Sequence, residues 1–250
     1  MENFDRKPHV VRNSWKSWKS LVNFIKYAAS GALRKQEYLS ECLAKDVRLN
    51  LFLKHLVGIC LIFSLRNGLP LESTPQHIVL CVIGYQLLMA EAILSLSADN
   101  GWSGVLRFRD KRRAHTILQV VGSALALAGS FIKMLDKTQN FNTLHGQFGL
   151  VAVVFTSVSL VNGLTSLYAF EWRRFCPGNI SKITHICFGI VAFAAASISL
   201  CYGFDKAFFR VWATDNFTNA LIGCTAAFTA IIIINPTINF FKKTYNLVSN

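Results

Sequence analysis

Long apolar stretches separated by short polar segments run through most of this sequence. A helix that crosses the hydrocarbon core of a bilayer needs about 20 mostly apolar residues. The first such stretch is the weakest, because it is short and carries Lys54 and His55. The sequence therefore predicts an all-α polytopic membrane protein with six transmembrane helices. The predicted spans are residues 49–66, 76–97, 114–135, 143–168, 183–204 and 217–241.

Composition agrees with a membrane protein. Hydrophobic residues make up 52% of the 250 positions and charged residues only 16%, whereas a soluble domain is about a quarter charged. Such a chain has too few polar groups to cover a water-exposed surface, which argues against an ordinary soluble domain. The net charge of +13 would suit nucleic-acid binding, but the basic residues border the apolar stretches. We therefore exclude nucleic acid as a partner and expect a lipid bilayer instead.

Basic residues gather in alternate loops, which predicts the orientation in the membrane. The positive-inside rule places the loops rich in lysine and arginine in the cytosol. The loop before the third span, the loop before the fifth span and both termini are basic, whereas the other loops are nearly balanced. We expect both termini in the cytosol and the glycosylation sequon at Asn216 on the opposite side. The cytosolic loops carry Arg107, Arg109, Lys111, Arg112, Arg113, Arg173, Arg174 and Lys182.

The chain divides into three predicted regions: a basic cytosolic tail over 1–45, a transmembrane domain over 46–245 and a short cytosolic tail over 246–250. The first region lacks the compact apolar core of a signal peptide. It combines Trp15 and Trp18 with several lysines. Two interpretations stay open for it: an amphipathic helix lying on the anionic cytosolic leaflet, or a disordered tail attracted to the membrane.

Four histidines recur near the starts of the second to fifth spans, at His77, His115, His145 and His185. Ionisable groups at membrane depth are costly, and their presence indicates function. Because successive helices start on opposite faces, His77 and His145 are expected near the non-cytosolic face and His115 and His185 near the cytosolic face. Two facing neutral imidazoles suit a six-coordinate haem iron. We therefore predict a central four-helix bundle that holds two haem groups, one near each face.

Glycines follow these histidines at helical spacing. Gly149 and Gly189 lie four residues after His145 and His185, and Gly84 and Gly122 lie seven residues after His77 and His115. Offsets of four and seven return to the same face of a helix. We expect these four glycines to leave room for a flat macrocycle. The alternative is that glycine is simply common in membrane helices.

Other uses of the histidines stay open. A proton relay would be expected to include buried carboxylates, but Glu91 is the only acidic residue well inside a predicted span. A zinc site would need its ligands at one depth, whereas these histidines divide between two. Any one of them alone would more ordinarily be a packed, hydrogen-bonded residue. His55 does not fit the scheme; we expect it to line a cytosolic pocket or to pack, with a substitute ligand as the remaining alternative.

Four short motifs resemble the cytochrome b-561 family, the transmembrane ascorbate-dependent reductases. The likeness extends from about Lys54 to Lys243 and is nearest to the short b-561 domain-containing branch. Two departures from the family are Pro75-Gln76-His77, where a histidine–proline step is usual, and Leu94-Ser95-Leu96-Ser97, where other branches carry a tyrosine-arginine ending linked to ascorbate. The motifs are Lys54-His55-Leu56-Val57, Leu88-Met89-Ala90-Glu91-Ala92, His115-Thr116-Ile117-Leu118-Gln119 and His145-Gly146-Gln147-Phe148-Gly149-Leu150.

The resemblance implies six helices and two non-covalent b haems, with iron bound by His77 with His145 and by His115 with His185. It implies that cytosolic ascorbate gives one electron to the cytosolic haem and that the electron then passes to the other haem. The acceptor would be monodehydroascorbate or ferric iron on the non-cytosolic side. An endoplasmic reticulum or vesicle membrane is favoured over the plasma membrane, and a homodimer is a further expectation.

Substrate contacts are expected at both ends. Arg109, Lys111, Arg112 and Arg113 crowd the approach to His115, where cations would attract anionic ascorbate and hydrogen-bond its oxygens. Arg113 is the preferred contact, and the alternative is that these charges only set topology. On the other face, we expect Asn142, near His145, to help an acceptor dock.

The predicted function is thus a transmembrane oxidoreductase, and two alternatives stay open. One is a proton-coupled transporter or channel that uses the histidines as relays, and the other is a haem-binding membrane protein without turnover. The first would be colourless, and the second would hold haems that ascorbate does not reduce.

Overall fold

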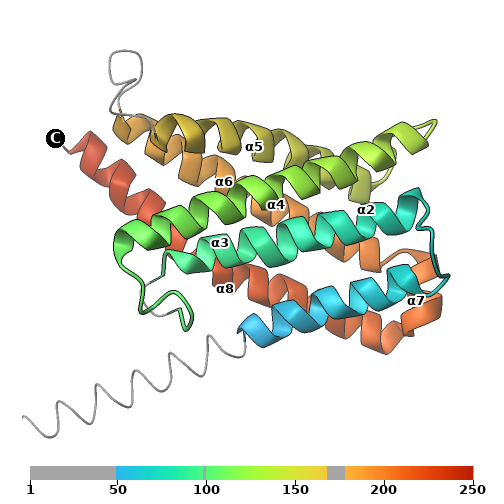
Figure 1. Cartoon of the computed structure of the whole chain (residues 1–250). Helices are drawn as coiled ribbons and strands as arrows, with labels where there is room; N and C mark the ends of the chain where they lie inside the picture. Colours follow the sequence, from blue (N-terminus) through green and yellow to red (C-terminus); the bar gives the residue numbers. More distant parts are fainter. Residues whose placement is uncertain (1–48, 98–99, 168–177, 250) are drawn as a thin grey trace, which may run out of the picture. The chain divides into compact units, whose positions relative to one another are not determined.

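The structure is a computed structural model that describes residues 49–97, 100–167 and 178–249. All of them fall in one compact unit, Val47–Asn250. The tail over 1–45, Arg173 and Arg174 lie outside the described residues. The described part consists of helices and their connections, without a strand (Figure 1). The elements are a first helix over Leu49–Leu65, then α2 (Ser73–Cys81), η1 (Val82–Met89), α3 (Ala90–Ser95), α4 (Phe108–Asp136), α5 (Leu144–Leu167), α6 (Gly178–Phe204), α7 (Ala207–Ala213) and α8 (Asp215–Val248).

The length and apolar character of these helices confirm an all-α polytopic membrane protein. Within the described residues, five helical stretches are long and apolar enough to cross a bilayer, and α2, η1 and α3 together form one of them. The helix Leu49–Leu65 is apolar but shorter, which agrees with its being the weakest predicted span. The five are Ser73–Ser95, Phe108–Asp136, Leu144–Leu167, Ile180–Phe204 and Asp215–Leu247.

Two helices extend well past the predicted limits. α4 begins at Phe108 instead of residue 114, and α8 continues to Val248 instead of ending at 241. The apolar pattern marks only the part of a helix that lies in hydrocarbon. Beyond it, the helix continues into polar sequence because its backbone groups still bond within the segment. Pro236 lies inside α8 without ending it.

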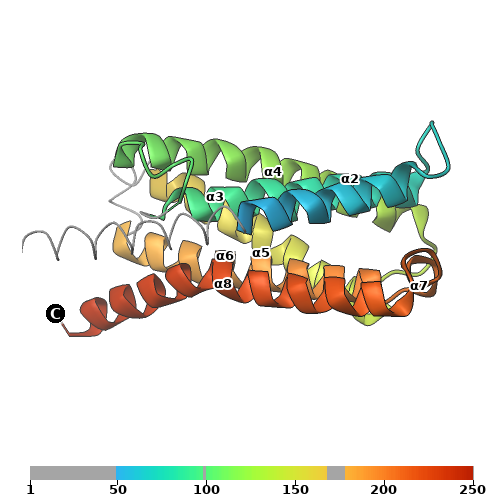
Figure 2. The ribbon, with the colours of Figure 1, turned by 90° about the horizontal axis from the view of Figure 1, so that it is seen from below.

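Four long helical stretches form the bundle that positions the histidines. α5 packs along α6, and α4 packs against α2, η1 and α3. α8 and the shorter first helix flank this bundle (Figure 2). α8 contacts α6. The rings of Phe52 on the first helix and Phe228 on α8 stack with their centroids 4.0 Å apart.

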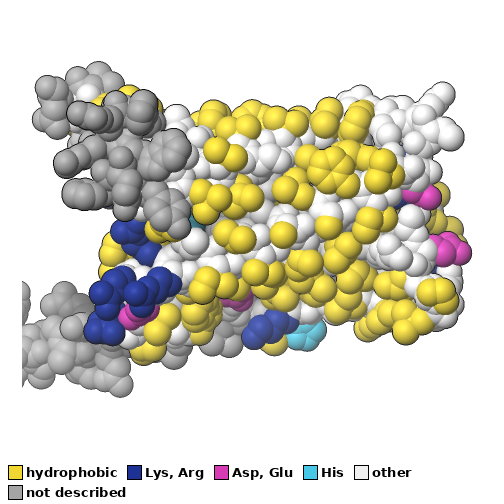
Figure 3. Space-filling view, turned by 45° about the horizontal axis from the view of Figure 1, so that its top comes forward, with side chains coloured by type: hydrophobic (Ala, Val, Ile, Leu, Met, Phe, Trp, Pro, Cys, Tyr) yellow, Lys and Arg dark blue, Asp and Glu magenta, His cyan; other side chains and the backbone are white. Residues whose placement is uncertain are grey.

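The outer surface suits a lipid environment. Hydrophobic side chains cover the length of the face shown in Figure 3, whereas most of the lysine and arginine side chains on it gather at one end. Large apolar side chains such as Ile117, Val154 and Ile234 are exposed. A soluble protein rarely exposes so continuous an apolar surface, so these residues are placed to face lipid.

Candidate functional site

The four bundle histidines meet in two pairs. His77 on α2 faces His145 on α5, with ring centroids 6.0 Å apart and ring planes at 87°. His115 on α4 faces His185 on α6, at 6.1 Å and 88°. Since a metal–imidazole bond is about 2 Å long, two such bonds hold the nitrogens roughly 4 Å apart and the ring centres roughly 6 Å apart. Each pair is therefore spaced to hold one metal ion between its rings.

A hydrogen bond fixes the tautomer of each histidine. In all four, Nδ1 lies 2.8–2.9 Å from a backbone carbonyl oxygen. A carbonyl oxygen can only accept, so Nδ1 carries the proton and Nε2 keeps a free lone pair. This is the arrangement of a metal-ligating histidine. The donor–acceptor pairs are His77 with Gly129, His115 with Ala92, His145 with Ser199 and His185 with Ser159.

Two serines that the sequence reasoning missed support His145 and His185. The hydroxyl of Ser199 on α6 donates a hydrogen bond to the carbonyl oxygen of His145 at 2.8 Å. The Oγ atom of Ser199 also lies 3.2 Å from His145 Nδ1. Ser159 on α5 makes the matching contacts with His185, at 3.4 Å and 3.3 Å. Each serine thus holds both the backbone and the ring of a histidine on the neighbouring helix.

Two further glycines lie directly against imidazole rings. A Cβ atom on Gly163 would come within 3.0 Å of the His185 ring, and one on Gly203 within 3.4 Å of the His145 ring. A methyl group at Gly163 would crowd the His185 ring, whereas one at Gly203 would reach ordinary van der Waals contact with the His145 ring. The missing side chains therefore help to set where the two rings can lie.

A repeat of 40 residues relates α5 to α6 and could have revealed these positions. His145, Gly149, Ser159 and Gly163 on α5 correspond in spacing to His185, Gly189, Ser199 and Gly203 on α6. The hydrogen bonds pair the beginning of each helix with the end of the other. Because α5 and α6 are antiparallel and have the same spacing, His145 on α5 lies opposite Ser199 on α6, and His185 on α6 lies opposite Ser159 on α5.

The helical stretches α2–η1–α3 and α4 show a similar repeat, with one extra residue in the first of them. His77 and Gly84 correspond to His115 and Gly122 at a spacing of 38, but the carbonyl acceptors Ala92 and Gly129 are 37 apart. The extra residue falls between Gly84 and Ala92, where η1 is a π-helix. A π-helical stretch accommodates inserted residues and is frequent at functional sites. It brings the carbonyl of Ala92 to His115, while Glu91 accepts a hydrogen bond from Trp102 Nε1 at 2.8 Å.

The structure places two of the four expected glycines at a contact between helices. A Cβ on Gly84 would lie 2.7 Å from the carbonyl oxygen of Gly122, and one on Gly122 would lie 3.0 Å from that of Gly84. These glycines let the backbones of η1 and α4 touch, and their contact with a cofactor stays a prediction. Gly149 lines the cavity described next, and a Cβ on Gly189 would meet the hydroxyl of Ser159 at 3.4 Å.

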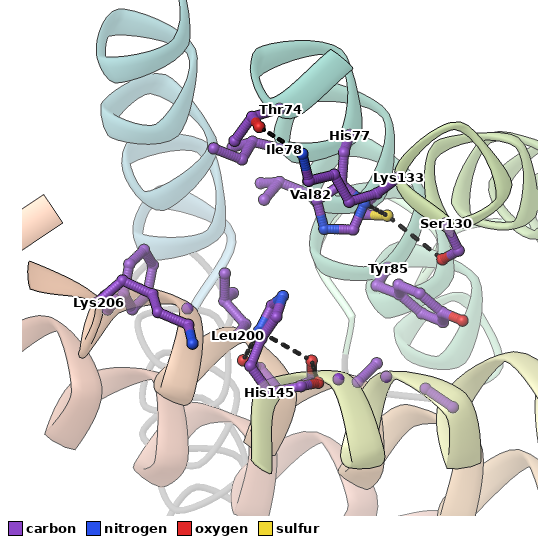
Figure 4. Close-up of a pocket in the computed structure, with 18 of the residues that line it drawn as sticks. Thr74, His77, Ile78, Val82, Tyr85, Ser130, Lys133, His145, Leu200 and Lys206 are labelled. Carbon is purple, nitrogen blue, oxygen red and sulfur yellow. Dashed lines mark hydrogen bonds between the residues drawn. The ribbon is translucent and has the colours of Figure 1, made fainter. Parts of the chain in front are cut away.

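A cavity of about 390 Å³ surrounds the His77–His145 pair. Its lining is mostly apolar, and the two imidazoles enter it from helices on opposite sides (Figure 4). Lys133, Lys137 and Lys206 also line it. Asn142, expected near an acceptor, is exposed and is not among the lining residues; the asparagine that lines the cavity is Asn140.

The basic residues before His115 have unequal roles. Lys111 is buried, and its ammonium group donates to the carbonyl oxygen of Ser97 at 2.9 Å, so this lysine serves the fold. Arg113, the preferred contact, lies 3.4 Å from Asp110. Arg109 and Arg112 are exposed, and the charge of Arg112 acts on His115. Among the described residues, the exposed arginines at this end that no carboxylate pairs with are Arg109 and Arg112, and Arg112 is the nearer of them to His115 in the sequence.

His55 lies apart from both pairs. Its ring is exposed, and Nδ1 bonds the carbonyl oxygen of Leu51 one turn earlier at 2.7 Å. This contact holds the ring against its own helix. His55 is therefore neither packed in the interior nor part of either histidine pair.

Haem is the metal group that fits this ligand set. Among the described residues, no group of three or more His, Cys, Asp or Glu could hold a bare metal ion. A porphyrin iron brings its own equatorial nitrogens and needs only two axial ligands from the protein. Fold and sites together define a polytopic helical membrane protein with two candidate bis-histidine sites.

Comparison with known proteins gives the family. Residues 76–210 match the family described as eukaryotic cytochrome b561, and the chain belongs to this family. Membership implies haem b binding and transmembrane electron transfer. The mouse (Mus musculus) protein named "Transmembrane reductase CYB561D2" is 28% identical over 169 residues, which cover 66% of this chain and 75% of the relative. The human (Homo sapiens) protein of that name is 28% identical over 172 residues, with the same coverage.

Proposed function

We propose that this protein carries single electrons across a membrane, from cytosolic ascorbate through two bis-histidine b haems to monodehydroascorbate or ferric iron on the other side. The observation that carries the proposal is the presence of two imidazole pairs, each with free Nε2 atoms, at different depths of one bundle. The relatives named transmembrane reductases support an oxidoreductase. When bound, haem iron supplies one-electron exchange between its ferric and ferrous states.

The spacing of the pairs along the bundle suits this task. His115 and Gly129, the residue that binds His77, are 14 residues apart on α4, which is about 21 Å along a helix axis. The hydrocarbon core is about 30 Å thick. Ascorbate and ferric ions do not cross it, because burying charge in hydrocarbon is expensive. Two sites that divide this distance allow an electron to cross without its carrier.

The protein's own residues contribute position and protonation. The carbonyl acceptors keep each Nδ1 protonated, so each Nε2 stays available as a ligand. Ser199 and Ser159 add a second contact at His145 and His185. A haem held by two histidines, His77 with His145 or His115 with His185, would leave no free position for oxygen and would supply electron exchange. We assign the arginine-rich end, with Arg109 and Arg112, to the cytosolic donor, since exposed cations attract an anion.

The proton-relay alternative is disfavoured by the hydrogen bonds of the same histidines. Each Nδ1–H points to a backbone carbonyl oxygen, which does not bind a proton at ordinary pH and so cannot pass one on. The four imidazoles therefore do not form a chain.

The test is an absorption spectrum of the purified protein before and after ascorbate. We expect a b-type spectrum that ascorbate reduces, with about two haems per chain. His115→Ala should remove one haem and slow reduction by ascorbate, while the control His55→Ala should change neither. Colourless wild-type protein, or a His115→Ala variant with unchanged haem content, would contradict the proposal.

A further inference from the structure

A short helix lies across one end of the bundle. α7 (Ala207–Ala213) connects α6 to α8, two of the stretches that are long and apolar enough to span a membrane. In Figure 2 it is seen nearly end-on, whereas the long helices run across the view, so its axis crosses theirs (Figures 1 and 2). Because the long helices cross the bilayer, α7 lies roughly parallel to the membrane plane, at the level where the chain turns back.

The inner face of α7 is attached to the bundle by aromatic contacts. Phe209 and Ala213, one helical turn apart, are buried. The ring centroid of Phe209 lies 4.9 Å from that of Phe63 on the first helix. It also lies 4.9 Å from that of Phe204 at the end of α6. This face of the short helix is therefore fully used by the protein itself.

The outer face of α7 is apolar and exposed. Phe208, Val211 and Trp212 recur at the spacing of one helical face, and all three are exposed. Tryptophan gathers where a membrane meets water, and an amphipathic helix that lies in this layer buries its apolar face at the boundary of headgroups and acyl chains. The outer face of α7 therefore fits the surface of a lipid bilayer.

The charge on α7 does not oppose contact with lipid. Arg210 is the only charged residue of the helix. It binds Asp205 at 2.6 Å and Asp215 at 2.9 Å, and it donates to Asn219 Oδ1 at 3.0 Å. These contacts tie the cation to residues just before and just after the helix, so it is not left unpaired at the apolar face.

α7 also forms part of the wall of the cavity around His77 and His145. Phe208 and Phe209 line the cavity together with Phe63 of the first helix. Because Phe208 lines the cavity and is also half exposed, its ring separates the cavity from the surroundings of the protein. A helix of this length is not stable by itself, so its position depends on what contacts its two faces.

We propose that the outer face of α7 binds the lipid surface of the bilayer and that this contact holds α7 closed over the His77–His145 cavity. The partner is the interfacial layer of the membrane, with Trp212 at the level of the headgroups and Val211 among the upper parts of the acyl chains. The lipid contact is independent of the proposed function. The effect on the cavity rests on it, since a haem must lie between the two histidines for its retention to change.

The first experiment tests the lipid contact in nanodiscs that hold one chain each. Val211→Cys places a thiol on the outer face of α7, and the control Asn67→Cys places one at an exposed position in the loop between the first helix and α2. A negatively charged maleimide is added, and mass spectrometry of the peptides measures the modification. We expect the thiol of Val211→Cys to react about 10-fold more slowly, because a charged reagent enters an apolar layer at a cost. Equal rates overturn the proposal, and a second copy cannot cause the protection because each disc holds one chain.

The second experiment tests closure of the cavity. Val211→Asp places a charge on the outer face, and Val105→Asp makes the same change in the loop before α4, at the other end of the bundle; the two valines are 87% and 88% exposed. Both changes are made in a His115→Ala background, in which the His77–His145 site alone keeps its haem. Transfer of haem to excess apomyoglobin, followed by absorbance, measures haem loss from the discs. Val211→Asp should lose haem about 10-fold faster, the order expected when a valine loses its apolar surroundings, and Val105→Asp should not.

The two experiments separate the possible failures. A protected thiol with unchanged haem loss shows lipid contact without closure and overturns the second half of the proposal, and equally fast haem loss in both aspartate variants overturns that half too. Wild-type discs without haem contradict the proposed function and closure together, while the maleimide rates still decide the lipid contact. Val211→Ser, a milder variant, should accelerate haem loss by a smaller factor and replaces Val211→Asp if that one misfolds.

Discussion

The position of one proton decides what each paired histidine can do. Nδ1 donates to a carbonyl, and the lone pair of Nε2 remains for the space between the rings. At His145 and His185, a serine on the facing helix adds a second contact. The histidines themselves could be predicted from the sequence, because their spacing relative to the spans is visible there. Ser159 and Ser199 could not be recognised one by one, since serine is common in membrane helices; they emerge only from the 40-residue repeat.

Removal of one of these serines should weaken one site. Ser199→Ala loses the hydroxyl contacts to His145 while the carbonyl contact remains. Loss of a supporting partner typically costs a metal site 10–100-fold in affinity or activity, so we expect about 10-fold weaker haem retention at the His77–His145 site. Haem content after gel filtration measures it. Ser157→Ala is the control, because Ser157 bonds only the carbonyl of Val153 in its own helix, at 2.9 Å. Equal haem loss in both variants would contradict this role.

At the scale of elements, the apolar pattern predicts where helices lie but not how closely they approach. The spans match the observed helices because about 20 apolar residues have no other stable form in hydrocarbon. Helix ends were missed at α4 and α8, where polar residues continue the helix. The η1 insertion was missed because it is a single residue, visible only when the spacing of the histidines is compared with that of their acceptors. The contact between Gly84 and Gly122 could not be predicted, because spacing alone does not reveal which neighbour a glycine meets.

The contact between η1 and α4 should be sensitive to one methyl group. In Gly84→Ala, the new Cβ would lie 2.7 Å from the carbonyl oxygen of Gly122 and 2.8 Å from the backbone nitrogen of Ala126. Backbone atoms yield little, so the helices must separate. We expect a loss of about 1–3 kcal/mol, typical of overpacking, measured as a lower Tm in detergent. Gly223→Ala, with no atom within 4 Å of the new Cβ, should keep the wild-type Tm; if it falls equally, close packing at Gly84 is not the cause.

At the scale of the whole molecule, the two ends of the bundle carry differently organised positive charge. At the His77–His145 end, three lysines line a cavity, and one of them, Lys133, pairs with Asp136. At the His115–His185 end, Lys111 donates a hydrogen bond to the backbone of Ser97. Asp110 lies close to both Arg107 and Arg113. This leaves Arg112 as the arginine whose charge acts on the histidine pair. The sequence places five cations there but does not show which of them bond to other residues of the fold; the five are Arg107, Arg109, Lys111, Arg112 and Arg113.

This division makes the donor end testable with two adjacent arginines. Arg112→Gln should slow haem reduction at low ascorbate by several-fold, with less effect at saturating ascorbate, because the missing cation mainly reduces the local concentration of the anion. Arg113→Gln removes the same charge one residue away, from a side chain already beside Asp110, and should change the rate less. Stopped-flow reduction over a range of ascorbate concentrations measures both.

If the two variants are equally slow and salt removes both effects, ascorbate responds to the summed positive charge at this end of the bundle, and Arg112 makes no specific contact. If only Arg112→Gln is slow and part of its deficit persists at high salt, the guanidinium group contacts the donor directly, since a hydrogen bond at close range is screened much less than a distant charge.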